Sequence, residues 1–193
     1  ELLLSERIPR DVAVIRPRAE EVRASVGAAI NAAPSVRRLT LPRDAAPATH
    51  LLSNGRYAVM LTASGSGYSR WRDIAITRWR EDATSDNCGA YIFLKDTQTG
   101  LVFSPTAQPM NEKTEASVVF GEDHAQFRRR DGTLASEMDV LVSGEDDGEV
   151  RRVCLTNSGR RAREIELTSY SELVLTAPAT ENAHPAFAKM FVE

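Results

Sequence analysis

The sequence predicts a mainly β fold, an antiparallel β-sandwich over residues 49–193, with a helical and linker extension before it over residues 1–48. Short strand-like runs follow one another after Thr49, turn sequences separate them, and no crossover helix lies between them. Strands joined by tight turns pair in the antiparallel sense. Because the runs alternate apolar and polar residues, each strand has one dry and one solvated face, which indicates two stacked sheets.

The extension over residues 1–48 is rich in Ala, Arg and Pro and contains no aromatic residue. A helix is expected over residues 17–33, because Pro17 suits the first helical position and Glu20 and Glu21 favour the positive end of the helix dipole. Three prolines within residues 34–48 indicate a linker. The apolar stripe of the expected helix consists of Val22, Val26, Ala29, Ile30 and Ala33.

Turn sequences divide the rest of the chain into hairpins. Asn54-Gly55 is a strong hairpin signal, because both central residues of a tight turn must accept positive φ. Further turns are expected at residues 96–100 (DTQTG), at Asp131-Gly132, at residues 145–148 (EDDG) and at residues 157–159 (NSG). The last of them leads into one long strand around residues 163–175. In that strand one face is expected to carry Ile165, Leu167, Leu173 and Leu175.

Composition argues against several classes of partner. The chain holds 24 Lys and Arg against 27 Asp and Glu, a formal net charge of −3, so no nucleic-acid partner is expected. No apolar run is long enough to span a bilayer, so no direct membrane contact is expected. The chain begins without Met and without a signal peptide, and we interpret it as a piece of a longer polypeptide. Cys88 and Cys154 are then expected to be two buried free thiols.

Motifs for metal binding and nucleophilic catalysis are not found in the sequence. His50, His124 and His184 lie far apart and predict no metal site. The run Ser64–Gly67 lacks both the G-x-S-x-G pattern of a nucleophile elbow and the G-K-[ST] of a phosphate loop. No catalytic residue and no cofactor are therefore predicted.

Charged clusters are interpreted as surface features. Acidic pairs such as Glu122-Asp123, and the acidic turn at residues 145–148, are more typical of solvated turns than of catalytic carboxylate pairs. Strand alternation sends Arg129 to the opposite face from Arg128 and Arg130, so this run does not form one basic patch.

The most informative stretch is residues 65–89, GSGYSRWRDIAITRWREDATSDNCG. It contains both tryptophans, Trp71 and Trp79, close to Tyr68 and interleaved with arginines. Aromatic faces stack on the C–H faces of sugars while guanidinium groups bind hydroxyls, which favours carbohydrate binding. The same mixture builds polar domain interfaces, and a tryptophan of a sandwich also anchors its two sheets. All three interpretations stay open at this point.

Longer runs resemble a known family. LLSNGRYAVMLTASGSGYSRWRDIAITRWREDATSDNCGAYIFLKD, followed by VFSPTAQP, resembles the N-terminal β-sandwich, of the supersandwich type, of glycoside hydrolase family 94. RRVCLTNSGRRAREIELTSYSELVL and HPAFAKMFVE fit the same domain. That family contains the inverting sugar phosphorylases, and GYSRWRDIAITRWRED is most similar to its group of cyclic β-1,2-glucan synthases. The resemblance covers residues 1–12 and 49–193.

The resemblance implies a non-catalytic module of a β-1,2-glucan-processing enzyme. In the family, a general-acid Asp of an (α/α)6-barrel acts with inorganic phosphate in an inverting reaction, and no Asp of this chain matches that motif. The implied partners are that barrel in the same polypeptide, a β-glucan oligosaccharide and a second copy in a homodimer. The parent is expected to be anchored in the bacterial inner membrane with this soluble region on the cytoplasmic side. Because the family's N-terminal domain is usually larger than residues 49–193, we expect the sandwich to be truncated at its C-terminal end.

The resemblance also implies a site. The GYSRW segment matches the Gly-rich aromatic loop that contacts sugar or barrel in the family, and HPAF is implied at the interface. Two other functions remain as alternatives, a free-standing carbohydrate-binding module and a purely structural interaction domain. The residues implied for sugar or barrel contact are Tyr68, Ser69, Arg70, Trp71, Arg78 and Trp79, and those implied for the interface are His184 and Phe187.

Overall fold

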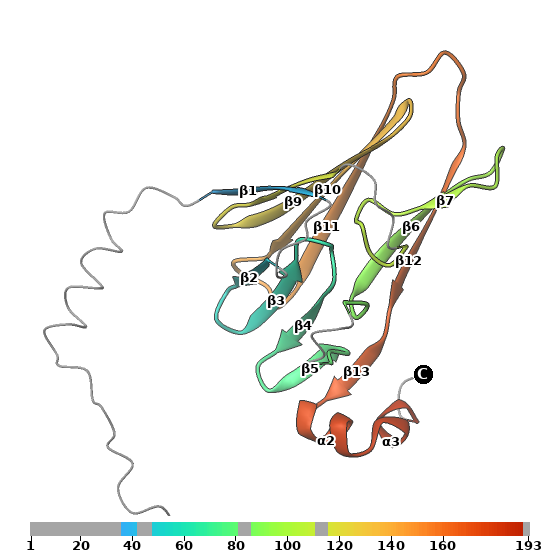
Figure 1. The fold of residues 1–193 in the computed structure, drawn as a ribbon. Helices are drawn as coiled ribbons and strands as arrows, with labels where there is room; N and C mark the ends of the chain where they lie inside the picture. Colours follow the sequence, from blue (N-terminus) through green and yellow to red (C-terminus); the bar gives the residue numbers. More distant parts are fainter. Residues whose placement is uncertain (1–35, 42–47, 81–85, 111–115, 191–193) are drawn as a thin grey trace, which may run out of the picture. The chain divides into compact units, whose positions relative to one another are not determined.

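The computed structural model describes residues 36–41, 48–80, 86–110 and 116–190. The helix expected over residues 17–33 lies outside these residues, as does most of the expected linker. The described chain is mainly β and its strands pair in antiparallel sheets (Figure 1), which confirms the predicted fold class.

Five strands form the first sheet, which we call the β1–β11 sheet. Its order is β1-β8-β9-β10-β11, and every neighbouring pair is antiparallel. Leu134 pairs with Asp131, and Gly132 between them has a φ of 60°, so the predicted Asp131-Gly132 turn is confirmed. The strands are Arg37–Leu41 (β1), Ala116–Phe120 (β8), His124–Asp131 (β9), Leu134–Val142 (β10) and Glu149–Asn157 (β11).

A second five-stranded sheet, the β2–β13 sheet, has the order β13-β5-β4-β3-β2. The turn at Asn54-Gly55 joins β2 to β3, with Gly55 at a φ of 88°. Two short helices follow its last strand, Pro178–Ala183 (α2) and Pro185–Lys189 (α3), and no helix among the described residues is long and apolar enough to cross a bilayer. The strands of this sheet are Thr49–Ser53 (β2), Tyr57–Thr62 (β3), Gly67–Trp71 (β4), Ile74–Thr77 (β5) and Leu173–Thr176 (β13).

A third sheet adds to the two that the sequence predicted. This β6–β12 sheet has the order β12-β6-β7, with strands Ile165–Ser171 (β12), Ala90–Asp96 (β6) and Val102–Phe103 (β7). Alternation along a strand shows which of its faces is buried but not which sheet the strand joins. The number of sheets therefore could not be predicted from this pattern.

The main core fills the space between the two five-stranded sheets. Val59 and Leu61 of β3 face Phe120, Phe127 and Val140 of the other sheet's strands, and all five side chains are almost fully buried. Each such side chain stabilises the fold by about 1.5–3 kcal/mol through its removal from water. A smaller cluster of Leu94, Phe103 and Leu134 lies under the third sheet.

Two segments differ from the sequence expectation. β1 lies within residues assigned to the linker, because Arg37–Leu41 pairs along its whole length with β8. The expected long strand over residues 163–175 is two strands, since β12 pairs with β6 while β13 pairs with β5. Because β12 is the outer strand of a three-stranded sheet, its apolar residues are only partly covered, and Leu167 is 54% exposed.

The arginine run on β9 alternates as predicted. Arg129 points inward and is 4% exposed, and its guanidinium group binds both carboxylate oxygens of Asp131 at 2.9 Å. Arg128 and Arg130 lie on the exposed face. Cys88 and Cys154 are both free, but the expectation that they are buried is wrong: Cys88 is half-buried, and Cys154 is exposed because it lies on the outer strand β11.

Candidate functional site

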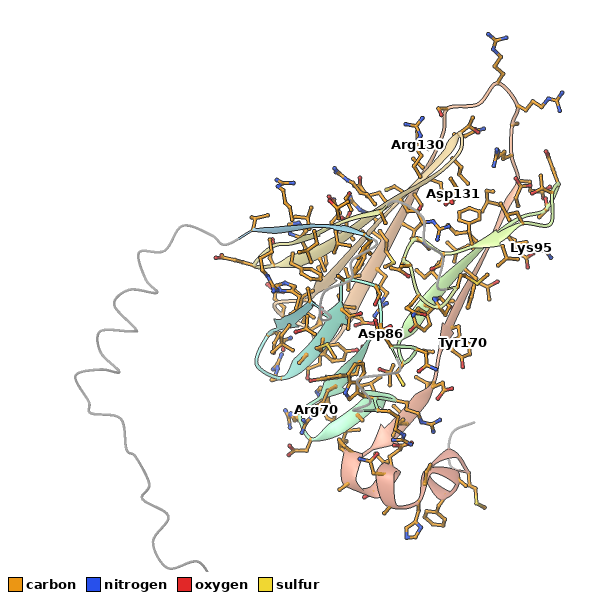
Figure 2. All side chains as sticks on the ribbon, viewed as in Figure 1. Arg70, Asp86, Lys95, Arg130, Asp131 and Tyr170 are labelled. Atoms are coloured by element: carbon orange, nitrogen blue, oxygen red, sulfur yellow. The ribbon has the colours of Figure 1, made fainter. Side chains whose placement is uncertain are left out.

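Strand β4 sends the predicted site residues to opposite faces of its sheet. Ser69 and Trp71 point into the sandwich with Tyr57 and Val59 of β3, whereas Tyr68 and Arg70 lie on the outer face. Figure 2 shows Arg70 beside β4 and β5. The six residues therefore do not form one site.

A pocket of about 260 Å³ lies on that outer face. We call it the Tyr68–Trp79 pocket. It brings together four of the predicted residues, Tyr68, Arg70, Arg78 and Trp79. Strands β5 and β13 contribute Ala75, Thr77 and Val174, and the wall is completed by Arg80 and, from α2, Pro178, Glu181 and Asn182.

The two aromatic rings of the pocket are in contact. The ring centroids of Tyr68 and Trp79 are 5.6 Å apart and their planes are inclined by 58°. Such a tilted pair presents ring faces and edges in different directions. Both side chains are partly exposed, so the rings are available to an apolar ligand surface.

The carboxylate of Glu181 in α2 binds two arginines of the pocket, Arg78 and Arg80. Nε of Arg78 donates to Oε1 of Glu181 at 2.9 Å, and Nη2 of Arg80 donates to the same oxygen at 2.7 Å. Nη1 of Arg80 binds Oε2 of Glu181 and also Oδ1 of Asn182, the latter at 2.6 Å. Hydrogen bonds from Arg80 hold the pKa of the Glu181 carboxyl below its usual value, despite its burial.

Arg78 also connects the pocket to the junction between β12 and β13. Its backbone N–H donates to the Glu172 carbonyl at 2.9 Å, and its Nη1 donates to Oε2 of Glu172 at 2.6 Å. The other carboxylate oxygen of Glu172 accepts a hydrogen bond from the Tyr170 hydroxyl at 3.2 Å. Arg78 therefore fixes the position of Trp79 by binding two carboxylates from later parts of the chain.

Trp71 and Ser69 connect the two five-stranded sheets instead of lining the pocket. Nε1 of Trp71 donates to Oδ2 of Asp147 at 2.6 Å, and the other oxygen of Asp147 pairs with Nε of Arg56 at 2.8 Å. The Ser69 hydroxyl donates to Oε2 of Glu149 at 2.9 Å. The acidic segment at residues 145–148 is a turn, as the sequence indicates, but it is not simply solvated, because Asp147 binds Trp71 and Arg56.

The glycine-rich turn before β4 is held by a cluster of hydroxyl groups. Ser64 binds the Asp86 carboxylate, and the Ser66 hydroxyl donates to the Asp86 carbonyl at 2.6 Å. The Tyr91 hydroxyl lies 3.2 Å from the Ser66 hydroxyl, and burial raises the pKa of Tyr91 to about 12. A side chain at Gly67 would place its Cβ 1.8 Å from the Met60 carbonyl oxygen, so only glycine fits there.

The other predicted contact residues lie elsewhere. His184 ends α2 and precedes α3, and Phe187 lies in α3, where both side chains are exposed. Neither lines the Tyr68–Trp79 pocket. Among the described residues, no group of three His, Cys, Asp or Glu side chains is placed to hold a metal ion.

Comparison with known proteins identifies the domain. The model of the glycosyl hydrolase 94 supersandwich domain matches residues 33–193. The chain belongs to glycosyl hydrolase family 94. The match confirms the resemblance found in the sequence. It also begins before β1, in agreement with the pairing of that strand in the sheet.

Known members of glycosyl hydrolase family 94 resemble the chain to different degrees. Cyclic beta-(1,2)-glucan synthase NdvB of Rhizobium meliloti (strain 1021) is 45% identical over 193 residues, which is 100% of this chain and 7% of that protein. N,N'-diacetylchitobiose phosphorylase of Vibrio furnissii is 25% identical over 150 residues, 75% of this chain and 19% of that protein. A 3-O-beta-D-glucopyranosyl-beta-D-glucuronide phosphorylase of Paenibacillus borealis is 28% identical over 135 residues, 69% of this chain and 17% of that protein. The chain thus spans less than a fifth of the length of each of these relatives.

Sequence reasoning missed the residues that reach the Tyr68–Trp79 pocket from a distant part of the chain. Glu181 and Asn182 lie about a hundred residues after Arg80, and nothing in the spacing of a β-sandwich sequence predicts such a contact. The period of two along β4 was available as a signal, because it already separates Tyr68 and Arg70 from Ser69 and Trp71.

Proposed function

We propose that this supersandwich domain is a non-catalytic module of a β-1,2-glucan-processing enzyme, and that its Tyr68–Trp79 pocket contacts a sugar unit of the glucan. The contact between the two aromatic rings on the outer face of the β2–β13 sheet carries this proposal. Aromatic faces bind the apolar side of a pyranose ring, while the surrounding arginine and asparagine groups bind its hydroxyls. The similarity to a cyclic β-1,2-glucan synthase supports the choice of glucan.

The size of the pocket sets the length of ligand that it holds. A volume of about 260 Å³ lies below the range of about 300–1,000 Å³ typical of drug-sized ligand sites. It therefore suits one glycosyl unit of a longer chain. The remaining sugars of a glucan would pass over the sheet surface or over another domain.

Chemistry is assigned to other parts of the parent polypeptide. We propose that inverting phosphorolysis or glycosyl transfer takes place in an (α/α)6-barrel of the same protein, and that this module positions glucan and barrel. The small share of each relative that the chain spans supports this division. We also place the parent at the cytoplasmic side of the bacterial inner membrane, a proposal that fractionation of the source cells would test.

Exposed apolar side chains support a packing role beside the sugar contact. Leu167 and Tyr170 of β12 and Leu173 and Leu175 of β13 are each at least 41% exposed. Leu167 and Tyr170 lie on opposite faces of β12, because they are three residues apart, so the four side chains do not form one patch. Exposed apolar side chains such as Leu167, Leu173 and Leu175 mark contacts with another protein surface. We propose that the catalytic barrel covers them; a homodimer contact or the continuation of the sandwich would be the alternative.

Titration of the chain with β-1,2-gluco-oligosaccharides, followed by NMR, tests the sugar contact. We expect shifts of the Trp79 indole signal at millimolar sugar and their loss in Tyr68→Ala and Trp79→Ala. Phe187→Ala removes an exposed aromatic side chain that does not line the pocket and is the control, which should bind normally. Absence of any shift at millimolar sugar would contradict the proposal.

A purely structural interaction domain is the second candidate, and the exposed side chains of β12 and β13 favour it. Mixing the chain with the separately produced remainder of the parent polypeptide would give a stable complex. Leu167→Asp together with Leu173→Asp should prevent that complex while leaving sugar shifts intact. A complex that resists this double change would argue against the surface.

A further inference from the structure

We propose that the ligand of the Tyr68–Trp79 pocket is a sugar unit with a negatively charged substituent, and that Arg70 binds the charged group. This inference rests on the proposed sugar contact and adds the chemical class of the ligand. The balance of charges and of hydrogen-bond donors around the pocket supports it.

The charges beside α2 balance without a ligand. Arg78 and Arg80 are paired with Glu181, and Arg78 is also paired with Glu172. Two guanidinium groups and two carboxylates thus form a neutral cluster. Its hydrogen bonds are short and its carboxylate Glu181 is buried, so this cluster is part of the fold.

Arg70 is the cation that this cluster leaves unbalanced. Its Nε donates to the Arg72 carbonyl at 2.7 Å, which orients the guanidinium group. Its nearest carboxylate is Asp73, 3.4 Å from Nη2, and the Asp73 side chain is fully exposed. An ion pair with that length and exposure contributes little. Arg70 therefore lines the pocket as an oriented but weakly paired positive charge.

Hydrogen-bond donors outnumber free acceptors in the same pocket. Glu181 is the one carboxylate among the described residues that line it, and both of its oxygens already accept from Arg78 and Arg80. Nε of Arg70 binds the Arg72 carbonyl and Nη2 reaches Asp73, so that Nη1 keeps its donors for a ligand. A carboxylate or phosphate ester offers acceptors alone and forms charge-assisted hydrogen bonds with guanidinium groups.

The position of Arg70 relative to the rings explains why the anion belongs to a sugar. Tyr68 and Arg70 are alternate residues of β4 on one face, so their Cβ atoms are separated by about 7 Å along the strand. A pyranose ring over Tyr68 and Trp79 would direct an exocyclic acidic group toward Arg70. Free inorganic phosphate would use the same cation without the rings, and the experiment distinguishes these two sources.

The experiment compares four probes on the chain, glucose, glucuronate, glucose 6-phosphate and inorganic phosphate, with the Trp79 indole signal as readout. We expect the two anionic sugars to bind at least about tenfold more tightly than glucose, because a hydrogen bond to a charged group is stronger. That preference should fall as NaCl is raised from about 20 to about 300 mM. Inorganic phosphate alone should bind more weakly than glucose 6-phosphate.

Two variants of equal charge assign the effect to Arg70. Arg70→Gln should remove the preference for anionic sugars while glucose still binds. Arg72→Gln removes the same charge two residues away, from a side chain that lies over Trp71 and does not line the pocket. It should leave the preference intact. Circular dichroism would show that both variants are folded.

Four results would overturn the inference. Equal affinity for glucose and for both anionic sugars would exclude the charged group while the sugar contact stands. Inorganic phosphate that binds as tightly as glucose 6-phosphate would exclude the sugar part. An equal loss of preference in Arg70→Gln and Arg72→Gln would show a general effect of net charge. No binding by any probe would overturn the proposed function together with this inference.

Discussion

Arg78 and Glu181, 103 residues apart in the sequence, join Trp79 to helix α2 through a 2.9 Å hydrogen bond from Nε to Oε1. The Glu181 side chain is 4% exposed and that of Arg78 is 14% exposed. A buried carboxylate with two guanidinium partners is a structural requirement of the pocket, because removal of one partner leaves charge without compensation.

Replacement of Glu181 by Gln should destabilise the fold by about 3 kcal/mol. Arg78 would keep its buried positive charge but would retain only Glu172 of its two carboxylate partners. Urea denaturation measures the change. Glu166→Gln is the matched control, since Glu166 pairs with Lys95 at 3.7 Å and both side chains are more than half exposed. That pair should contribute less than about 0.5 kcal/mol. Similar losses in both variants would contradict the structural role of Glu181.

Acid should weaken the fold through Glu181. The pKa of this carboxyl is lower in the folded chain than in the unfolded chain, because Arg80 and Arg78 donate hydrogen bonds to it. The stabilisation is therefore fully present above the ordinary value of 4.5 and is lost as pH falls through the folded pKa. Free energies of unfolding measured between pH 6 and pH 2 should fall less steeply in Glu181→Gln. An unchanged slope would contradict the pairing.

His50 should give a second pH effect at higher pH. Burial and the neighbouring Arg37 guanidinium hold the pKa of the His50 imidazole below its ordinary value of 6.5. Protonation therefore favours the unfolded chain, and stability should decrease as pH falls below 6.5, by up to about 1.4 kcal/mol per pH unit. His50→Gln should flatten this slope, whereas His184→Gln, at an exposed histidine, should not. Identical slopes in the two variants would contradict the effect.

The two tryptophans should respond in opposite ways to replacement by Phe. Trp71→Phe removes the hydrogen bond to Asp147 between the sheets, which should lower the free energy of unfolding by about 1–2 kcal/mol. Sugar shifts in the pocket should survive. Trp79→Phe should reduce sugar binding with a smaller effect on stability. Urea denaturation and NMR titration of both variants would reveal a reversed pattern if these roles are wrong.

Gly67→Ala should destabilise the chain by about 3 kcal/mol or more. Its φ is 152°, and the added Cβ would lie 1.8 Å from the Met60 carbonyl oxygen, so the pairing of β3 with β4 must shift. Gly144→Ala is the control, because nothing lies within 4 Å of its Cβ position. Thermal unfolding of the two variants checks the difference, and a stable Gly67→Ala would contradict the close approach.

Local features of the fold were predictable from the sequence and distant contacts were not. The Asp131-Gly132 turn and the alternation of Arg128, Arg129 and Arg130 follow from backbone geometry and strand period, which act between near neighbours. The split of β12 from β13 was not visible, because both segments have the same alternating pattern and differ only in which sheet they join.

The candidate site shows the same division. The aromatic and arginine content of residues 65–89 singled out a segment that lines a pocket, and the period of two separates the pocket residues from Ser69 and Trp71. Glu181 was not predictable, since its role depends on α2 returning to Arg78 and Arg80 after about a hundred residues. The weak pairing of Arg70 was not predictable either, because it depends on which carboxylates the fold places beside Arg78 and Arg80.

Glu172 connects the pocket to strand β12, with one carboxylate oxygen bound by Arg78 of the pocket and the other by the Tyr170 hydroxyl. A protein surface that displaces the Tyr170 hydroxyl changes the set of groups that compete for this carboxylate. A ligand that shifts Arg78 does the same from the other side. Under the proposals made above, a docking event and a sugar that each shift the hydrogen bonds of Glu172 would, by thermodynamic linkage, alter one another's free energy by the same amount.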